Sequence, residues 1–356
     1  FWLKFCITTP TVAWVSPQQA APQGQMNRLV AGVAGAGALA GAAYYFSQPG
    51  KPRNSAFVFV KPHAVTPQTN KLVRDELAAK GLKITGEGDL TSEVIDQKKL
   101  IDQHYYAIAS KATILKPSEL NVPKDKFEKA FGLSWDDALA KGVVFNAMDA
   151  CEKLGCTADE LNKAWGAAKK GGKLVKFGGG FYCGLVEITG QKPLYVFNGF
   201  FMTMRSQFTA PGCSIHYYTV EWDEDRLSWE DFRGKVLGPT DPKEAPKDSL
   251  RGKILSDWKD LGLKSEPNVG DNGVHASASP FEGLAERMNW LETPCRKDAY
   301  CKALVRAGIK EAVIKAWSVD PQVNLDSGKK GSLFDSLEDL DASACLEKAK
   351  KLQTLQ

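Results

Sequence analysis

The feature that most constrains this chain is the short apolar run AFVFV at Ala56–Val60. A continuous run of aromatic and β-branched residues this short predicts a strand buried on both faces. Lys61-Pro62 ends the run, because proline has no N–H to donate to a neighbouring strand. The chain must therefore place structure on both sides of this segment.

The residues after this run predict further regular elements. Thr69–Lys80 carries apolar residues at helical spacing and ends at Gly81. Leu82–Leu90 predicts a second strand, and Val94–Ala109 predicts a second helix that includes His104-Tyr105.

The sequence pattern changes from Lys111 onward, where prolines interrupt the chain and short helices are expected. Thr157–Glu160 is a candidate capping box for a helix that runs to about Lys170. The remaining expected elements are a hairpin of strands 181–188 and 194–201 with its turn at 189–193, a strand at 215–222, helices at 229–237 and 280–291, and a charged, mostly helical tail at 292–356.

Charge and cysteine usage bound the partners and the redox state. The net charge of +4, from 46 Lys and Arg against 42 Asp and Glu, is too small to argue for nucleic acid, and no nucleic-acid partner is expected. The eight cysteines are scattered and form no CxxC pair, so reduced, partly buried thiols are expected and a zinc site is not. A Cys295–Cys301 disulfide is the less favoured alternative.

The first 54 residues form a separate segment. No acidic residue precedes Asp75, which is typical of a targeting sequence, and residues 29–46 are uncharged and rich in Ala and Gly. That stretch is near the lower length limit for crossing a bilayer. A membrane anchor, a cleaved targeting segment and a flexible linker all remain open. An organellar location, in a plastid or mitochondrion and with or without a membrane anchor, is expected, with the cytoplasm as the alternative.

Several sequence pieces occur in one order along the chain. They are FVFVKP with Lys61, the step His104-Tyr105, VLGPTDPKEAPKDSLRG with Thr240 and Arg251, NVGDNGVHASAS with Asn272 and His275, and SPFEGLAERMNWL with Glu286. Together they resemble the nucleoside diphosphate kinase family, over Ser55 to about Ala109 and Ile215 to about Leu291. The spacing from Asn272 to His275 and from His275 to Glu286 is the most specific part of the resemblance.

The resemblance implies an α/β (α+β) fold with a ferredoxin-like antiparallel sheet, interrupted by an inserted small α/β lobe and followed by a helical C-terminal tail. The expected division is 1–54 targeting or anchor segment and linker, 55–110 first part of the kinase-like core, 111–210 inserted lobe, 211–291 second part of the core, and 292–356 C-terminal extension.

The resemblance also implies an activity. A nucleoside diphosphate kinase transfers the terminal phosphate of a nucleoside triphosphate to a nucleoside diphosphate through a phosphohistidine, here at His275. Glu286 would orient that imidazole, and Lys61 is expected to act in catalysis as well as in phosphate binding. The residues expected to hold the nucleotide and its phosphates are Lys61, Tyr105, Arg233, Thr240, Arg251, Asn272 and Ser277. Mg²⁺ would be held through the nucleotide phosphates. Nucleoside di- and triphosphates are the expected partners, and a homo-oligomer is expected. The N-terminal segment leaves association with a membrane or a larger complex open.

This chain departs from the family pattern at several positions. Gly234 stands where the family has a phosphate-binding Arg, so Arg233 is expected to reach the phosphate while Lys235 faces solvent. His63-Ala64 replaces the usual Asp-Gly, and Ala278 replaces the Asp after Ser277. His63, His104 and His216 are expected to be structural or solvated. The alternative to an active kinase is a catalytically weak or inactive nucleotide-binding scaffold subunit of an organellar or membrane-associated assembly.

Overall fold

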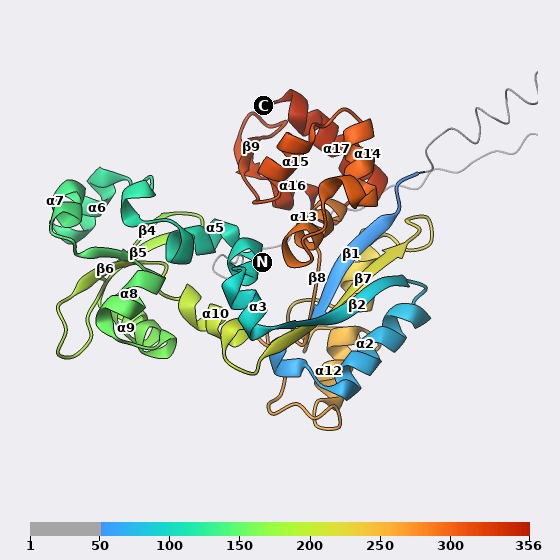
Figure 1. The fold of residues 1–356 in the computed structure, drawn as a ribbon, viewed down its shortest axis with the longest axis horizontal. Coiled ribbons are helices and arrows are strands. Elements are labelled where there is room, and N and C mark those ends of the chain that lie inside the picture. Colours follow the sequence, from blue (N-terminus) through green and yellow to red (C-terminus); the bar gives the residue numbers. More distant parts are fainter. Residues whose placement is uncertain (1–50) are drawn as a thin grey trace, which may run out of the picture. The chain divides into compact units, whose positions relative to one another are not determined.

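The computed structural model describes residues 51–356, which form a mixed α/β structure with two four-stranded sheets and many helices (Figure 1). The expected anchor or targeting stretch at residues 29–46 lies outside the described residues. Within residues 51–356 no helix is both long and apolar enough to cross a membrane.

The first sheet has the strand order β2-β7-β1-β8. β7 pairs antiparallel with both β1 and β2, and β8 pairs antiparallel with β1. The strands are β1 Asn54–Val60, β2 Lys83–Thr91, β7 Ser214–Trp222 and β8 Val274–Ala276. Strands distant in sequence are therefore brought together around β1.

β1 is buried on both faces, as its sequence predicts. Val58 and Val60 pack into a core shared with α2 (Pro67–Ala79) and α12 (Leu250–Asp257). Phe57 and Phe59 point to the opposite face and pack into a second core. Side chains alternate across a strand, so the continuous apolar run serves both cores.

The single helix expected at 94–109 is wrong. The chain forms α3 Ser92–Gln97, α4 Leu100–His104 and α5 Tyr106–Ala109, followed by a π-helical turn at Ser110–Ile114. Lys99 adopts a left-handed conformation with φ 53°, which ends the first helix. Tyr105, with φ −104° and ψ 37°, separates the next two. The breaks orient the short helix that ends at His104.

The second sheet has the order β3-β6-β5-β4. Its strands are β3 Val144–Asn146, β4 Leu174–Gly178, β5 Phe181–Val186 and β6 Leu194–Phe197. The expected β5–β6 hairpin is confirmed, but β6 ends earlier, because Phe201 begins α10 (Phe201–Thr209). β3 pairs parallel with β6, which no local pattern predicts.

Helices accompany this second sheet. The expected capping box is confirmed: the Thr157 hydroxyl accepts from the Glu160 N–H, and the Glu160 carboxylate accepts from the Thr157 N–H. The helices are α6 Lys124–Phe131, α7 Trp135–Ala140, α8 Ala147–Leu154 and α9 Ala158–Lys170, with a 3-10 turn at Pro117–Glu119.

A buried ion pair joins α10 to α4. Arg205 Nε lies 3.0 Å from both carboxylate oxygens of Asp102, which is fully buried. The Thr113 hydroxyl also donates to Asp102 at 2.5 Å. A buried charge is stable only when it is paired and hydrogen-bonded, so these contacts fix α4 against the rest of the structure.

The C-terminal residues are mostly helical, as expected, with one added two-stranded sheet. Their core also contains Phe281 and Leu284 of α13 (Pro280–Trp290). The elements are a 3-10 turn at Cys295–Lys297, α14 Ala299–Arg306, α15 Glu311–Trp317, β9 Gln322–Asn324, β10 Lys330–Ser332, α16 Leu333–Leu337 and α17 Ala342–Thr354.

Two expectations about boundaries and thiols are corrected. Cys295 and Cys301 form a disulfide, because the 3-10 turn brings their Cα atoms to 5.4 Å. Asn54, expected to belong to the N-terminal linker, is fully buried and begins β1. Its side chain donates to Asp341 at 2.8 Å and accepts from the Ala342 N–H at 2.8 Å.

Candidate active site

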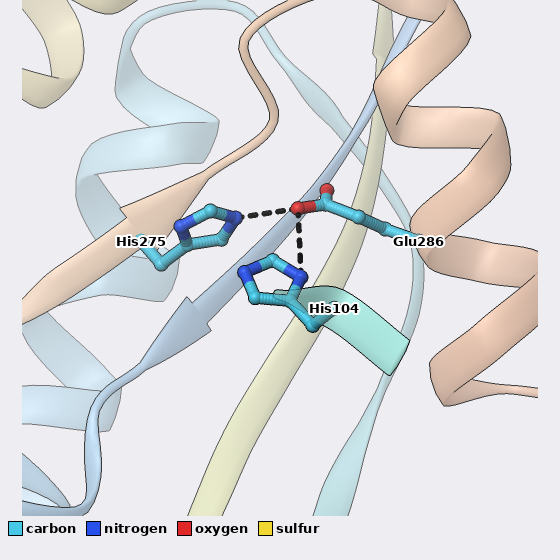
Figure 2. A group of neighbouring side chains, drawn as sticks. All are labelled: His104, His275 and Glu286. Carbon is cyan, nitrogen blue, oxygen red and sulfur yellow. Dashed lines mark hydrogen bonds and ion pairs between the residues drawn. The ribbon is translucent and has the colours of Figure 1, made fainter. Parts of the chain in front are cut away.

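β8 places His275 on the face of the sheet that carries Phe59. Val274 and Ala276 pack into the opposite core, while the His275 ring stacks on Phe59 with centroids 4.6 Å apart. His275 Nε2 lies 2.6 Å from Oε1 of Glu286, on α13 (Figure 2). The other ring nitrogen lies on the side of the imidazole away from Glu286. The His275 side chain is 17% exposed and that of Glu286 is 4% exposed, so the imidazole keeps a path to solvent.

Ser277 holds the second oxygen of Glu286. The Ser277 hydroxyl lies 2.5 Å from Glu286 Oε2 and accepts from the Phe57 N–H at 2.8 Å. Ser277 was expected to bind phosphate, but it is fully buried beneath the site and positions the carboxylate instead.

A Cβ on Gly283 would lie 2.7 Å from the Ser55 carbonyl oxygen. Glycine at this position therefore allows α13 to approach β1 closely.

Burial and nearby cations set the protonation of this pair. Burial, Lys61 and Arg251 lower the pKa of His275 well below its usual range, so the imidazole is neutral near pH 7. Burial raises the pKa of Glu286. The 2.6 Å contact requires one proton between Nε2 and Oε1. When that proton is on Nε2, Nδ1 has a free lone pair.

His104 lies against this pair and was not expected there. Its ring meets the His275 ring edge-on, with centroids 4.8 Å apart, and its Nδ1 lies 3.5 Å from Glu286 Oε1. The indole N–H of Trp290 donates to the same Nδ1 at 3.3 Å. The only sequence signal for this position was its place directly before Tyr105.

Lys61 follows β1 and lies beside the loop that leads into β8. Its ammonium donates to the Gly270 carbonyl at 3.1 Å, and its backbone N–H donates to Gly273 at 2.8 Å. Burial and the charge of Arg251 lower the pKa of Lys61 to about 7. Gly273 has φ 85°, a conformation that favours glycine. The chain can therefore turn sharply just before His275.

The other histidines have structural roles, as expected. His63 Nε2 accepts from the Gly273 N–H at 3.2 Å and so supports the same loop. His216, on β7, lies between two carboxylates, with Nδ1 2.7 Å from Asp89 and Nε2 2.9 Å from Glu87.

Arg251 brings a buried guanidinium to the loop before β8. It donates to the carbonyl oxygen of Val274 at 2.9 Å and to that of Gly238 at 2.8 Å. Burial and the charge of Arg233 lower the pKa of Arg251 to about 9. These hydrogen-bond partners are uncharged carbonyls, so they do not neutralise the guanidinium, and an anion nearby would be strongly favoured.

Two buried oxygens beside this group have no hydrogen-bond partner among residues 51–356. They are Thr240 Oγ1 and Asn272 Oδ1. Asn272 Nδ2 donates to the Thr240 carbonyl at 3.0 Å, so the two residues are held together. A buried polar atom without a partner costs about 1–3 kcal/mol, which a polar ligand group would recover.

Tyr105 and Arg233 complete the set of expected residues. The Tyr105 ring lies edge-on to His104 at 4.6 Å, and burial and Glu286 raise its pKa. Arg233, expected to reach the phosphate, instead donates to Glu338 at 3.0 Å and Asp339 at 2.5 Å. Lys235 is 72% exposed and pairs with Asp231, which confirms that it faces solvent.

Comparison with solved structures gives distant likenesses. No family model and no curated protein matches the chain. Among solved structures, a nucleoside diphosphate kinase from Encephalitozoon cuniculi has a TM-score of 0.33 and 11% identity, covering 67% of this chain and 90% of its own. One from Aquifex aeolicus has a TM-score of 0.32 and 13% identity, covering 67% and 94%. An NDP kinase from Pyrobaculum aerophilum has a TM-score of 0.32 and 17% identity, covering 67% and 96%. At these TM-scores the likenesses carry no argument about activity.

Proposed function

We propose that this protein is a nucleoside diphosphate kinase that works through a phosphohistidine at His275. The observation that carries the proposal is the bond between His275 Nε2 and the buried Glu286. In the reactive form the shared proton is on Nε2, which leaves the opposite ring nitrogen available. A partly exposed, neutral imidazole oriented by a carboxylate is equipped for nucleophilic attack. Lys61 and Arg251 supply positive charge close enough to lower the pKa of His275.

The proposed reaction has two half-steps. His275 Nδ1 attacks the terminal phosphorus of a nucleoside triphosphate, the bond from that phosphorus to the bridging oxygen breaks, and a nucleoside diphosphate leaves. Glu286 stabilises the positive charge that develops on the ring through Nε2–H. A second nucleoside diphosphate then takes the phosphoryl group by the reverse steps. Catalysis of this kind rests mainly on positioning and on charge stabilisation.

We propose that Thr240, Asn272, Lys61 and Arg251 hold the nucleotide. The unpartnered Thr240 and Asn272 oxygens suit hydroxyl donors of a ligand, and the two cations suit its phosphates. Mg²⁺ prefers oxygen ligands, whereas the group that could hold a metal within residues 51–356, His104, His275 and Glu286, offers two nitrogens. We therefore propose that Mg²⁺ arrives bound to the nucleotide phosphates.

We also propose that the sheet β2-β7-β1-β8 is the ferredoxin-like core, and that residues 111–210 are an insertion between its second and third strands. The strand order and the antiparallel pairing support this assignment.

Incubation of the full chain with ATP labelled at the γ-phosphate tests the proposed activity. We expect label that is lost in acid and retained in alkali, as a phosphohistidine behaves, and that passes to added nucleoside diphosphate. Absence of label under saturating Mg·ATP would refute the kinase proposal and favour a nucleotide-binding scaffold.

A further inference from the structure

We propose that Glu338 and Asp339 set the affinity of the site for nucleotide phosphates by competing with them for Arg233. This inference rests on the proposed function, because it assumes that phosphates bind beside His275. The two acids come from the C-terminal extension, so this extension would tune the site.

The acids hold Arg233 directly. One guanidinium nitrogen, Nη1, donates to Glu338 at 3.0 Å and to Asp339 at 2.5 Å. The Arg233 side chain is 13% exposed and that of Glu338 is 19% exposed, so this pair is only partly screened by water, whereas Asp339 is 45% exposed and its pair is screened more. One guanidinium with two carboxylates carries a net charge of −1. In this state the two carboxylates oppose the attraction of Arg233 for a phosphate.

The cluster of Arg233, Glu338 and Asp339 is attached to the elements that flank His275. The Asp339 N–H donates at 3.0 Å to the carbonyl of Ala278, three residues after His275. Arg233 lies in the π-helical segment Phe232–Leu237, and the next residue, Gly238, accepts from Arg251. The cluster is therefore joined both to the loop that follows β8 and to the buried guanidinium of the site.

The charge of Arg233 also reaches the reacting groups. It contributes to lowering the pKa of Arg251 and of His275, and it opposes the rise in the pKa of the half-buried Glu282. An anion bound near His275 would attract the same guanidinium. Arg suits this exchange, because its planar fork binds carboxylate and phosphate in similar geometry.

The acidic segment is fixed in place by Asp341. Its carboxylate accepts from the Trp229 N–H at 2.7 Å and from Asn54 Nδ2 at 2.8 Å. Trp229 starts the short helix that leads into the segment of Arg233. The carboxylates therefore stay close to Arg233, and an incoming phosphate must compete with neighbours at high effective concentration.

The test compares ADP affinity in the full-length protein with Glu338→Gln/Asp339→Asn, alone and combined with Arg233→Ala. Asn suits position 339, because that residue has φ 62° and Asn tolerates the left-handed region. Glu347→Gln/Asp326→Asn is the matched control, since it removes the same charge from exposed pairs with Lys350 and Lys351. Calorimetry with ADP needs no phosphotransfer.

We expect Glu338→Gln/Asp339→Asn to lower the ADP Kd roughly three- to tenfold, as expected for release of a partly exposed ion pair. The gain should disappear when Arg233→Ala is added, and the control should show none. Unchanged or weaker ADP binding, a gain that persists without Arg233, an equal gain in the control, or no ADP binding in any variant would each overturn the inference. If the ADP affinities change as expected but no phosphohistidine forms with ATP, only the kinase proposal is refuted.

Discussion

Glu286 holds His275 through one carboxylate oxygen, at 2.6 Å from Nε2, while its other oxygen is held by Ser277. Both oxygens of the carboxylate are thus held. Because Glu286 lies on α13, the packing of α13 against β1 fixes the orientation of the imidazole. A support of this kind keeps a nucleophile in one tautomer and one rotamer without contacting the substrate.

The first prediction concerns this pair. His275→Ala should abolish phosphohistidine labelling and leave the fold intact, because the residue is partly exposed on an edge strand. Glu286→Gln should lower the labelling rate about 10- to 100-fold, since the charge that stabilises the phosphorylated ring is lost. Rapid-quench labelling measures both.

The control for this experiment is His216→Gln, which changes a histidine held between Glu87 and Asp89. It should label like wild type. Wild-type labelling of His275→Ala would show that another residue accepts the phosphate.

The second prediction concerns proton uptake by Lys61. Its pKa of about 7 leaves it mostly neutral at pH 8, and a bound phosphate favours the ammonium form. Nucleotide binding should therefore raise this pKa and take up close to one proton at pH 8, but much less at pH 6. Affinity should fall as the pH rises above 7. Calorimetry in buffers of different ionisation enthalpy measures the uptake.

Lys61→Arg is the matched variant, because Arg stays charged over this pH range. It should bind nucleotide with little proton uptake at pH 8. Equal uptake in wild type and Lys61→Arg would assign the proton to another group.

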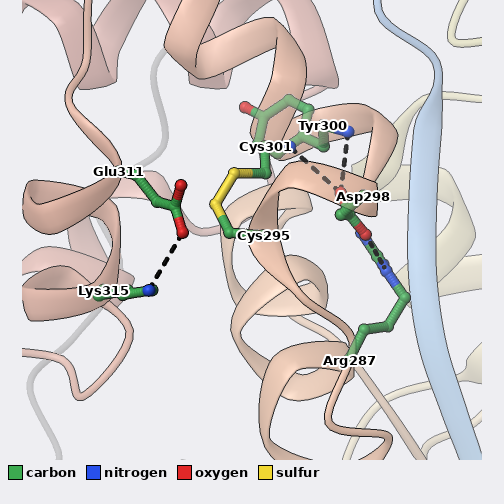
Figure 3. Close-up of a disulfide and its surroundings, with 7 residues drawn as sticks. All are labelled: Arg287, Cys295, Asp298, Tyr300, Cys301, Glu311 and Lys315. Carbon is green, nitrogen blue, oxygen red and sulfur yellow. Dashed lines mark hydrogen bonds and ion pairs between the residues drawn. A yellow bond between two sulfur atoms is a disulfide. The ribbon is translucent and has the colours of Figure 1, made fainter.

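The third prediction concerns the Cys295–Cys301 disulfide. Figure 3 shows it beside Asp298, which caps α14 by accepting from the Tyr300 N–H and pairs with Arg287 of α13. A disulfide stabilises a fold by restricting the unfolded chain, and the effect is smaller for a short loop such as this one. Cys295→Ala/Cys301→Ala should therefore lower the free energy of unfolding by about 2 kcal/mol. Denaturant titration checks this value.

A reductant should reproduce this loss in wild type and have no effect on the double variant. If both cysteines of the non-reduced protein react fully with an alkylating agent, the disulfide assignment is wrong.

The fourth prediction concerns the N-terminal boundary. Asn54→Ala removes hydrogen bonds to Asp341 and Ala342 at a fully buried position, and it should lower the free energy of unfolding by about 2 kcal/mol. Arg53→Ala, one residue earlier and exposed, should change it by less than about 0.5 kcal/mol. Equal effects of the two variants would move the start of the fold.

Several features of this protein were readable from local sequence. The apolar run of β1, the capping box of α9 and the proline at the start of α13 each follow from short-range physics, namely burial, backbone hydrogen bonding and the missing N–H of proline. The contact between His275 and Glu286 agrees with the orienting role that the family resemblance implied for Glu286.

Tertiary structure decided the rest. His104 meets Glu286 at the end of a short helix that follows left-handed Lys99, where the sequence predicts one continuous helix. Ser277 supports the carboxylate because its hydroxyl is held by the carbonyl oxygen of Phe57 on β1, 220 residues away in sequence. Arg233 is paired with acids that lie 105 and 106 residues further along the chain. Local propensity does not encode such distant pairings, because they depend on which buried faces and charges the whole fold brings together.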